Sequence, residues 1–294
     1  MQEISDRIDL EMNKPQVLLT VLAHPDDESF GAGGTLALYA QRGVSVYLVC
    51  ATRGEAGEVD ADCLTGFQSI AERREHELRC AAEKLGLAGV FFLGYHDSGM
   101  TGSPYNQHPD ALVAAPVEEV AGRVVEYIRL LKPQVVITFD PIGGYRHPDH
   151  IAIHQATVKA FFAANDPSQY PGEQPPHQPD KLYFHTFPKR FLKMMVRLMP
   201  LVGKDPHKFG RNGDIDLTSL IEPEFPTHAV INYRQVHQQK TEASLCHDSQ
   251  GGGNMGKGIM GLAARIAGEN DVYMRFHPPF QPGERVEKDL FKTG

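Results

Sequence analysis

Residues 17–28 read Val17-Leu18-Leu19-Thr20-Val21-Leu22-Ala23-His24-Pro25-Asp26-Asp27-Glu28, and this stretch decides the fold class. Its apolar first half predicts a buried β-strand. One histidine and three carboxylates follow where that strand ends. Open α/β sheets bind their ligands at the carboxyl ends of the strands. The stretch therefore predicts a parallel sheet with a functional site at that edge.

A second strand with a similar ending lies far along the chain. Residues 135–139 are all apolar except for one threonine, and they predict another buried strand. After it come Asp140, Tyr145, Arg146 and the run His147-Pro148-Asp149-His150. Because the strands of a parallel sheet end at one edge, the two polar clusters can converge on a single cation.

The residue types of the two clusters indicate a metal site. Two neutral imidazoles and one carboxylate, with positions left for water, form the ligand set of hydrolytic zinc, and non-haem iron(II) uses the same set. We expect His24, Asp27 and His150 to be the ligands. Asp26 then lies beside the ion as an unligated carboxylate, which a general base requires. Taken singly, Asp26 and Asp149 are more typical of helix caps, but the two motifs together favour the metal site.

The rest of the amino-terminal half alternates between strand and helix patterns. Short apolar strands separated by amphipathic helices predict a Rossmann-like, doubly wound α/β fold with helices on both faces of a mostly parallel sheet. The expected strands are 17–22, 44–50, 90–93 and 135–139, and the expected helices are 33–42, 67–85, 117–131 and 151–164.

We expect a single domain over residues 1–294. Its core would span 15–165, and the carboxyl-terminal part, 180–294, would pack on the core as an extension over the site. Residues 165–179 contain five prolines and predict an extended surface connection, because a strand pattern resumes at 181–185. The Gly/Pro/Asn-rich residues 98–116 predict a long loop covering the site.

Composition excludes several classes of function. With 41% hydrophobic and 22% charged residues and a net charge of −8, the chain has no basic field for nucleic acid. The amino end lacks a signal-peptide pattern and no apolar run could insert in a membrane, so we expect a cytoplasmic protein. Cys50, Cys63, Cys80 and Cys246 are scattered, which predicts reduced thiols. A homo-oligomer is compatible with the sequence.

The motifs, in their order and spacing, resemble those of the LmbE-like (PIG-L) family of zinc-dependent N-acetylglucosamine deacetylases. The likeness spans roughly residues 17–250. Residues 95–100 are similar to the branch that acts on precursors of mycothiol and bacillithiol. Arg146 departs from that branch, which often has a small residue there. The stretches that carry the resemblance are Ala23–Glu28, Thr52–Gly57, Arg74–Leu78, Tyr95–Met100, His147–His150 and Leu245–Gln250.

The resemblance implies roles for individual residues. It implies His24, Asp27 and His150 on zinc and Asp26 as the base. His147 would face the substrate carbonyl as its electrophilic partner, held in a charged state by Asp149, with Tyr145 nearby. Arg74 and Asp97 would bind the sugar or its aglycone. The alternatives for these last residues are structural: a salt bridge of Arg74 with Glu77 or Asp97, a turn cap for Asp97 and packing for Tyr145.

The predicted function is removal of an N-acetyl group from an N-acetylglucosaminyl compound, a small aminosugar that could be a thiol-cofactor precursor. The alternatives are an amidase that cleaves a larger acyl group from glucosaminyl thiol conjugates, and a sugar- or nucleotide-binding protein without turnover. The free carboxylate of Asp26 disfavours the binding protein.

Three further features have two interpretations each. Gly31-Ala32-Gly33-Gly34-Thr35 resembles a dinucleotide loop, but close helix packing explains it better, because the charged motif separates it from the strand. His247 either caps a helix or approaches the site from the far side. The basic amphipathic stretch Lys189–Arg211 suits a membrane surface, but we favour a helix packed over the sheet or against a subunit.

Overall fold

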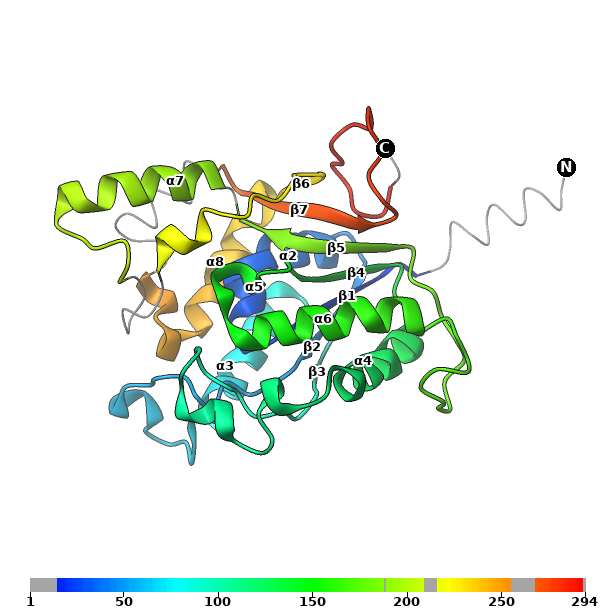
Figure 1. Cartoon of the computed structure of the whole chain (residues 1–294), viewed down its shortest axis with the longest axis horizontal. Coiled ribbons are helices and arrows are strands. Elements are labelled where there is room, and N and C mark those ends of the chain that lie inside the picture. Colours follow the sequence, from blue (N-terminus) through cyan, green and yellow to red (C-terminus); the bar gives the residue numbers. More distant parts are fainter. Residues whose placement is uncertain (1–14, 188, 209–215, 255–267, 293–294) are drawn as a thin grey trace, which may run out of the picture.

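The computed structural model describes residues 15–187, 189–208, 216–254 and 268–292. One seven-stranded sheet runs through them in the order β3-β2-β1-β4-β5-β7-β6 (Figure 1). The first five strands pair in parallel, and β7 is antiparallel to both of its neighbours. The strands are β1 Val17–Leu22, β2 Ser45–Cys50, β3 Gly89–Phe92, β4 Val135–Phe139, β5 Lys181–Thr186, β6 Ala229–Asn232 and β7 Asn270–His277.

The helices lie on both faces of this sheet, so the predicted α/β class is confirmed. The helices α4 and α6 pack together on one face, and α2, α3 and α8 pack together on the other (Figure 1). The helices are α2 Gly33–Gln41, α3 Ile70–Leu85, α4 Val117–Leu131, α5 Gly143–Arg146, α6 Pro148–Ala163, α7 Lys189–Leu198 and α8 His237–Cys246.

Two of these helices begin at residues other than those predicted, in each case because of a cap. Ser69 accepts a hydrogen bond from the Glu72 backbone N–H, so α3 begins at Ile70 rather than at residue 67. Helix α6 begins three residues earlier than predicted, because Pro148 occupies its first position and His147 is its N-cap. The HPDH motif therefore forms the first turn of α6.

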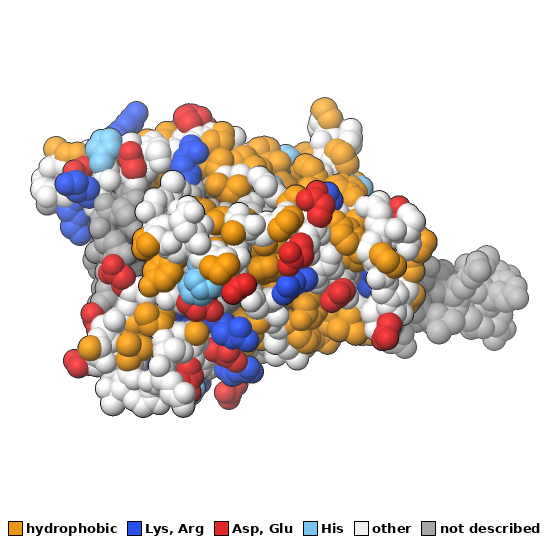
Figure 2. Space-filling model, turned by 60° about the horizontal axis from the view of Figure 1, so that its bottom comes forward, with side chains coloured by type: hydrophobic (Ala, Val, Ile, Leu, Met, Phe, Trp, Pro, Cys, Tyr) orange, Lys and Arg blue, Asp and Glu red, His pale blue; other side chains and the backbone are white. Residues whose placement is uncertain are grey.

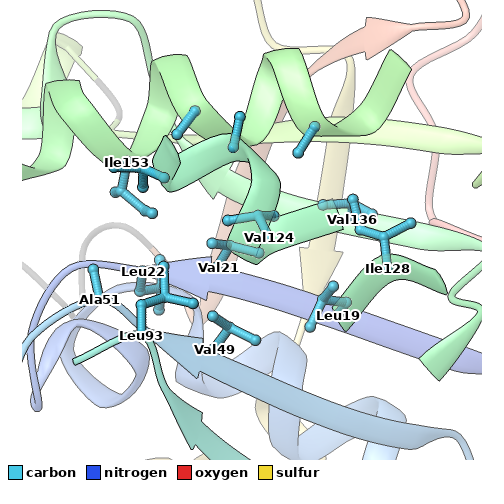
Figure 3. Close-up of a cluster of buried hydrophobic side chains, with 14 of the residues drawn as sticks. Leu19, Val21, Leu22, Val49, Ala51, Leu93, Val124, Ile128, Val136 and Ile153 are labelled. Carbon is cyan, nitrogen blue, oxygen red and sulfur yellow. The ribbon is translucent and has the colours of Figure 1, made fainter. Parts of the chain in front are cut away.

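Alternating side chains of the strands supply two hydrophobic cores. Leu19 and Val21 of β1 face α4 and α6, where they meet Val124 and Ile153 (Figure 3). Leu18 belongs to the opposite core, which α2 and α8 cover. Burial on both faces explains why β1 is apolar along its whole length, a pattern typical of parallel sheets. These two cores fix the carboxyl ends of the strands relative to one another.

The glycine-rich start of α2 serves close packing, as the sequence analysis favoured. A Cβ atom added at Gly34 would lie 2.1 Å from the Tyr233 ring, so only glycine lets the helix approach this tyrosine. Residues 165–179 contain no strand and lead from α6 to β5, in agreement with an extended connection. The prediction of a single domain stays a prediction, although β6 and β7 extend the sheet of the core.

The prediction of four reduced cysteines is wrong for two of them. Cys80 near the end of α3 and Cys246 at the end of α8 form a disulfide, with a Cα–Cα distance of 5.8 Å. The two helices pack side by side. Because the two cysteines are 166 residues apart in sequence, no local pattern indicated that they pair. Cys50 and Cys63 are free thiols.

The amphipathic stretch that follows β5 packs, in its described part, against the segment that comes after it rather than over the sheet, and packing against a subunit stays a prediction. The described part of α7 packs through Leu192 and Val196 against Met199, Leu217 and Leu220. Leu198 and Leu201 are exposed, at 50% and 80%. The end of the stretch, from residue 209 onward, lies outside the described residues. Within the described ranges, none of the helices has the length and apolarity to cross a membrane.

Charged side chains of both signs are distributed over the surface. Figure 2 shows basic and acidic groups side by side on one face, with apolar side chains between them. Neighbouring opposite charges on this surface include the exposed pair of Lys159 with Glu118, at 2.6 Å.

Candidate functional site

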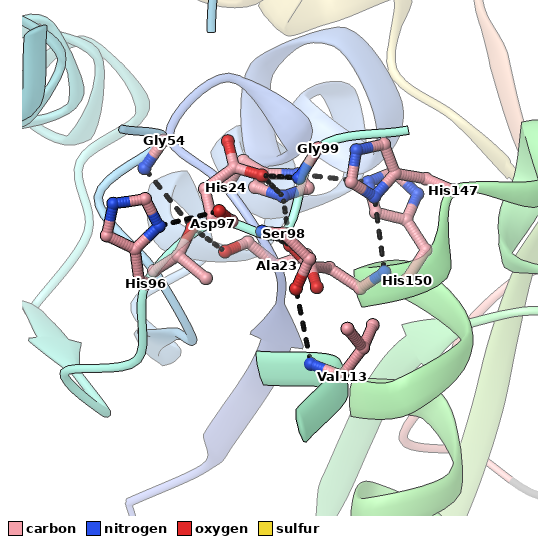
Figure 4. A network of polar contacts seen from close by, with 12 residues as sticks. Ala23, His24, Gly54, His96, Asp97, Ser98, Gly99, Val113, His147 and His150 are labelled. Carbon is pink, nitrogen blue, oxygen red and sulfur yellow. Dashed lines mark hydrogen bonds and ion pairs between the residues drawn. The ribbon is translucent and has the colours of Figure 1, made fainter. Parts of the chain in front are cut away.

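The two predicted clusters meet at the carboxyl edge of the sheet (Figure 4). His24 follows β1 by two residues, and Asp27 precedes a short turn of π-helix at Glu28–Ala32. His150 lies in the first turn of α6, beyond the end of β4. The neighbouring, parallel strands β1 and β4 thus bring together residues that are 126 positions apart.

Three side chains form a small triangle at this edge, to which Asp27 contributes both carboxylate oxygens. The distances are 3.2 Å from His24 Nδ1 to His150 Nε2, 3.5 Å from His24 Nδ1 to Asp27 Oδ2, and 3.3 Å from His150 Nε2 to Asp27 Oδ1. Ligands bound at about 2.1 Å around one tetrahedral zinc ion stand roughly 3.4 Å apart. The separations therefore fit three ligands of one ion.

The other ring nitrogens of both histidines face acceptors. His24 Nε2 lies 3.1 Å from Asp149 Oδ2 and 3.4 Å from Asp97 Oδ1, and His150 Nδ1 lies 3.2 Å from the Gly143 carbonyl. Metal-binding histidines usually donate their second N–H in this way. Two alternative groups also share His24: His24 with Asp97 and Asp149, which would need the same Nε2 atom and leave His150 unused, and His24 with His147 and His150. The spacing of His24, Asp27 and His150 is compatible with one ion, and their role as ligands stays a prediction.

Asp26 has an unusual backbone conformation beside this group. Its φ of 121° is rare for any residue with a side chain, and such strain costs about 1–3 kcal/mol. Its carboxylate Oδ2 lies 3.0 Å from Arg74 Nη2. Burial raises the pKa of Asp26 to about 6; Asp27 raises it too, and Arg74 opposes the shift. The carboxylate is therefore ionised at neutral pH, as a general base must be, and its role as the base stays a prediction.

Arg74 lies inside the protein, 4% exposed, rather than on a surface salt bridge. Besides Asp26, its guanidinium donates to the carbonyls of Pro25 at 2.7 Å and Gly54 at 3.0 Å. A Cβ at Gly54 would lie 2.0 Å from the guanidinium, so the glycine makes room for it. Of the two predicted salt bridges, the one with Glu77 is wrong, because Arg73 pairs with Glu77. The one with Asp97 is present, with Arg74 Nη1 at 3.9 Å from Asp97 Oδ2. Arg74 thus holds Asp26, and sugar binding by Arg74 stays a prediction.

The two interpretations of Arg74 predict different effects of its substitution on two substrates. Because the guanidinium holds Asp26, we expect Arg74→Ala to lower turnover about equally on a full glucosaminyl substrate and on a small acetamide without the sugar. A contact with the sugar would instead spare the small substrate. The measurement is kcat/KM for both substrates, with metal content determined in parallel. Selective loss on the sugar substrate would contradict the positioning role.

Asp97 is buried beside His24, and its carboxylate makes contacts within the site. Oδ1 accepts a hydrogen bond from the Gly99 backbone N–H at 2.8 Å, in addition to facing His24. Burial opposes ionisation, but His24 and these hydrogen bonds hold the pKa of Asp97 well below its usual range. Asp97 combines the predicted turn cap with a contact to His24, and its binding of substrate stays a prediction.

The expected pairing of His147 with the Asp149 carboxylate is wrong. The Asp149 carboxylate lies 3.1 Å from His24 Nε2 and accepts a hydrogen bond from the Ser98 N–H at 2.9 Å. His147 instead accepts at Nδ1, at 3.2 Å, from the backbone N–H of Asp149. The reason is its place as N-cap of α6, which turns Nδ1 toward the first turn of the helix.

The expectation that His147 is charged is wrong for the same reason. Because Nδ1 accepts a hydrogen bond, the ring hydrogen resides on Nε2. Burial, followed by His24 and His150, lowers the pKa of His147 well below its ordinary value. A neutral His147 can still donate from Nε2 to an oxygen atom that gains negative charge.

Tyr145 and Arg146 precede the HPDH motif and have different surroundings. The Tyr145 ring stands edge-on to His150, with a centroid distance of 4.9 Å, and it packs against the cluster of Met199 and Leu217. Burial raises the pKa of Tyr145, so its hydroxyl stays protonated. Arg146 is exposed and donates to the carbonyl of Ser219 at 3.0 Å, not to a residue of the candidate metal site. A catalytic role for Tyr145 stays a prediction.

The sequence analysis did not predict the buried pair of Glu28 with His247, which lies behind the site. His247 Nε2 lies 2.7 Å from Glu28 Oε1, and both residues are 0% exposed. Burial alone would lower the pKa of His247, but the Glu28 carboxylate raises it above its ordinary value. His247 agrees with both interpretations: it is the C-cap residue of α8, and its side chain reaches Glu28 behind the site. The motif that contains Glu28 was visible in the sequence, but its partner 219 residues away was not.

The sheet and the histidine–carboxylate cluster at its edge define a class of α/β enzyme with a donor set for one divalent ion. The profile described as PIG-L, GlcNAc-PI de-N-acetylase, matches residues 19–161. This range contains all nine residues named above as candidate site residues from the sequence: His24, Asp26, Asp27, Arg74, Asp97, Tyr145, His147, Asp149 and His150.

Relatives match beyond this range. The 1D-myo-inositol 2-acetamido-2-deoxy-alpha-D-glucopyranoside deacetylase of Kineococcus radiotolerans is 41% identical over 257 residues, which cover 81% of this chain and 70% of that protein. The protein of the same name from Thermobifida fusca is 43% identical over 242 residues, covering 79% and 82%. The chain therefore belongs to the PIG-L family of de-N-acetylases.

A solved structure shows the same fold. The N,N'-diacetylchitobiose deacetylase from Pyrococcus horikoshii, in complex with its inhibitor MPG, superimposes with a TM-score of 0.62 and covers 94% of this chain and 92% of that one. At 19% identity this likeness concerns the fold alone. The activity follows from the family, and the family is that of hydrolases that remove N-acetyl groups.

Proposed function

We propose that this protein is a zinc-dependent deacetylase that releases acetate from an N-acetylglucosaminyl inositol. The single observation that carries the proposal is the triangle of His24 Nδ1, Asp27 and His150 Nε2, with edges of 3.2–3.5 Å. The names of the relatives from Kineococcus radiotolerans and Thermobifida fusca support the choice of aminosugar and aglycone. Iron(II) is the alternative ion, because it accepts the same ligands.

Hydrolysis of an amide needs an activated water molecule and a stabilised oxyanion. His24, Asp27 and His150 would hold a zinc ion, which would supply Lewis acidity for both needs. Asp26, ionised and held by Arg74, takes the proton of the attacking water, and this proton passes to the leaving amine when the C–N bond breaks. His147 donates a hydrogen bond from Nε2 to the carbonyl oxygen as negative charge develops there. Asp149 keeps the His24 ring oriented through Nε2.

The proposed function is tested by amine release from purified, zinc-reconstituted protein. We expect rapid deacetylation of N-acetylglucosaminyl inositol and slower deacetylation of N-acetylglucosaminyl malate, because the relatives are named for the inositol compound. The metal-free protein serves as the control and should be inactive until zinc is added. Equal, metal-independent rates, or no turnover of either compound, would refute the proposal.

A further inference from the structure

The backbone of Asp26 is held in its strained conformation from both sides. Its N–H donates to Glu28 Oε2 at 3.0 Å, and its carbonyl accepts from the N–H groups of Ser29 at 3.0 Å and Phe30 at 2.9 Å. Both of these donors lie in the π-helical turn Glu28–Ala32. The Glu28 carboxylate is the only side chain within the described residues that holds the Asp26 N–H.

Glu28 is in turn fixed by two donors. Its Oε1 lies 2.7 Å from His247 Nε2 and accepts from the Ser29 hydroxyl at 2.5 Å. The Phe30 ring packs edge-on against His247, with the centroids 5.7 Å apart. Neither the carboxylate nor the imidazole is exposed to water, so their mutual contact is not weakened by solvent.

The segment that carries His247 is itself tied to α3. On one side of His247, Cys246 forms the disulfide with Cys80. On the other side, Ser249 donates its backbone N–H and its hydroxyl to Glu77, at 2.9 and 2.7 Å. The same helix carries Arg74, which contacts the Asp26 side chain. Helix α3 thus fixes the side chain of Asp26 directly and its backbone through His247 and Glu28.

We propose that Glu28 and His247 are positioning residues, which hold the backbone of Asp26 so that its carboxylate faces the reacting water. This inference rests on the proposed function, in which Asp26 is the general base. A residue with φ of 121° relaxes when its hydrogen-bond partner is removed, because the strain has to be maintained by its surroundings. A displacement of about 1 Å at a catalytic group can cost roughly 10²-fold in rate.

The first test compares variants that break or keep the contact. Glu28→Ala and His247→Leu should each lower kcat by about 10–10²-fold, with KM and zinc content nearly unchanged. His247→Gln can still donate to Glu28 and should recover most of kcat. His154→Leu is the matched control: His154 is also buried and hydrogen-bonded, to the Phe139 carbonyl at 2.8 Å, but it lies outside the site. This control should lose stability and keep kcat.

The second test is a double-mutant cycle with Asp26→Asn. If Glu28 acts through the base, Glu28→Ala should cost nothing further once the base is gone. A full multiplicative loss in the Asp26→Asn background would overturn the proposal, and so would a His247→Gln variant as slow as His247→Leu. A wild-type enzyme without turnover would instead refute the proposed function.

The crystal structure of Glu28→Ala gives a readout that does not depend on activity. We expect Asp26 to leave the positive-φ region and its carboxylate to move away from Arg74. A backbone that keeps its φ near 121° together with the ion pair to Arg74 would overturn the inference, whatever the kinetics show.

Discussion

Asp26→Asn is expected to lower kcat by about 10²–10⁴-fold while the protein still binds one metal ion per chain. Asparagine nearly preserves the shape of the side chain but cannot accept the proton of the attacking water. Arg74 can still donate to the amide oxygen, so the substitution should leave the fold intact. The measurements are steady-state deacetylation and metal content by elemental analysis.

The pH profile of the wild-type enzyme provides a companion measurement. Asp26 must be ionised to act, and burial raises its pKa to about 6 before metal is bound. Because a neighbouring cation favours the ionised form, kcat/KM should fall as the pH falls through about 6 or somewhat below. An Asp26→Asn variant that deacetylates at close to the wild-type rate would show that Asp26 is structural.

Substitution of the ligands is expected to remove the metal and the activity together. His150→Ala should abolish stoichiometric zinc binding, because the imidazole supplies one of only three protein donors. Asp149→Asn should weaken zinc affinity by about 10–100-fold, since the carboxylate orients His24 without belonging to the triangle. His147→Ala should keep the metal and lose turnover. Zinc affinity is measured by competition with a chromogenic chelator.

This series also distinguishes the three groups of donors that share His24, since a site of His24, His147 and His150 would lose the metal in His147→Ala. If the ion bound to His24, Asp97 and Asp149, then Asp149→Asn would abolish binding and His150→Ala would leave it unchanged. That order of affinities would contradict the assignment made here. Circular dichroism of each variant separates loss of metal from loss of fold.

Local patterns in the sequence are sufficient to predict the edge at which the site forms. The apolar strands β1 and β4 and the polar residues directly after them are contiguous, so periodicity and strand-end chemistry place His24 and His150 together. The resemblance to the family adds the roles. The parallel half of the sheet follows from the same alternation of strands and helices.

The orientation of side chains within the site could not be predicted in this way. Asp149 is next to His150 in sequence, yet its carboxylate turns to His24, because His147 caps the helix through the Asp149 backbone. Whether a carboxylate of a helical first turn faces one imidazole or another depends on tertiary packing, which no local pattern contains.

The sequence analysis also missed two contacts between residues that are far apart in sequence. The contacts of His247 with Glu28 and of Cys80 with Cys246 join residues that are 219 and 166 positions apart. Both depend on α8 packing against α3, and α8 has little amphipathic pattern to reveal its place. The sequence analysis did not predict strand β7 either, because it assigned no strand or helix to the residues that precede this strand.

The position of β7 in the sheet affects the order in which the strands can pair during synthesis. Strand β7 follows β5 and β6 in sequence, yet it lies between them in the sheet. Until residues 270–277 leave the ribosome, one side of β5 keeps unpaired backbone groups, and β6 lacks the strand it pairs with. At ~5–20 residues per second this interval lasts for seconds. Because an open strand edge is a template for association with other nascent chains, the nascent protein can associate through β5 until β7 has paired with it.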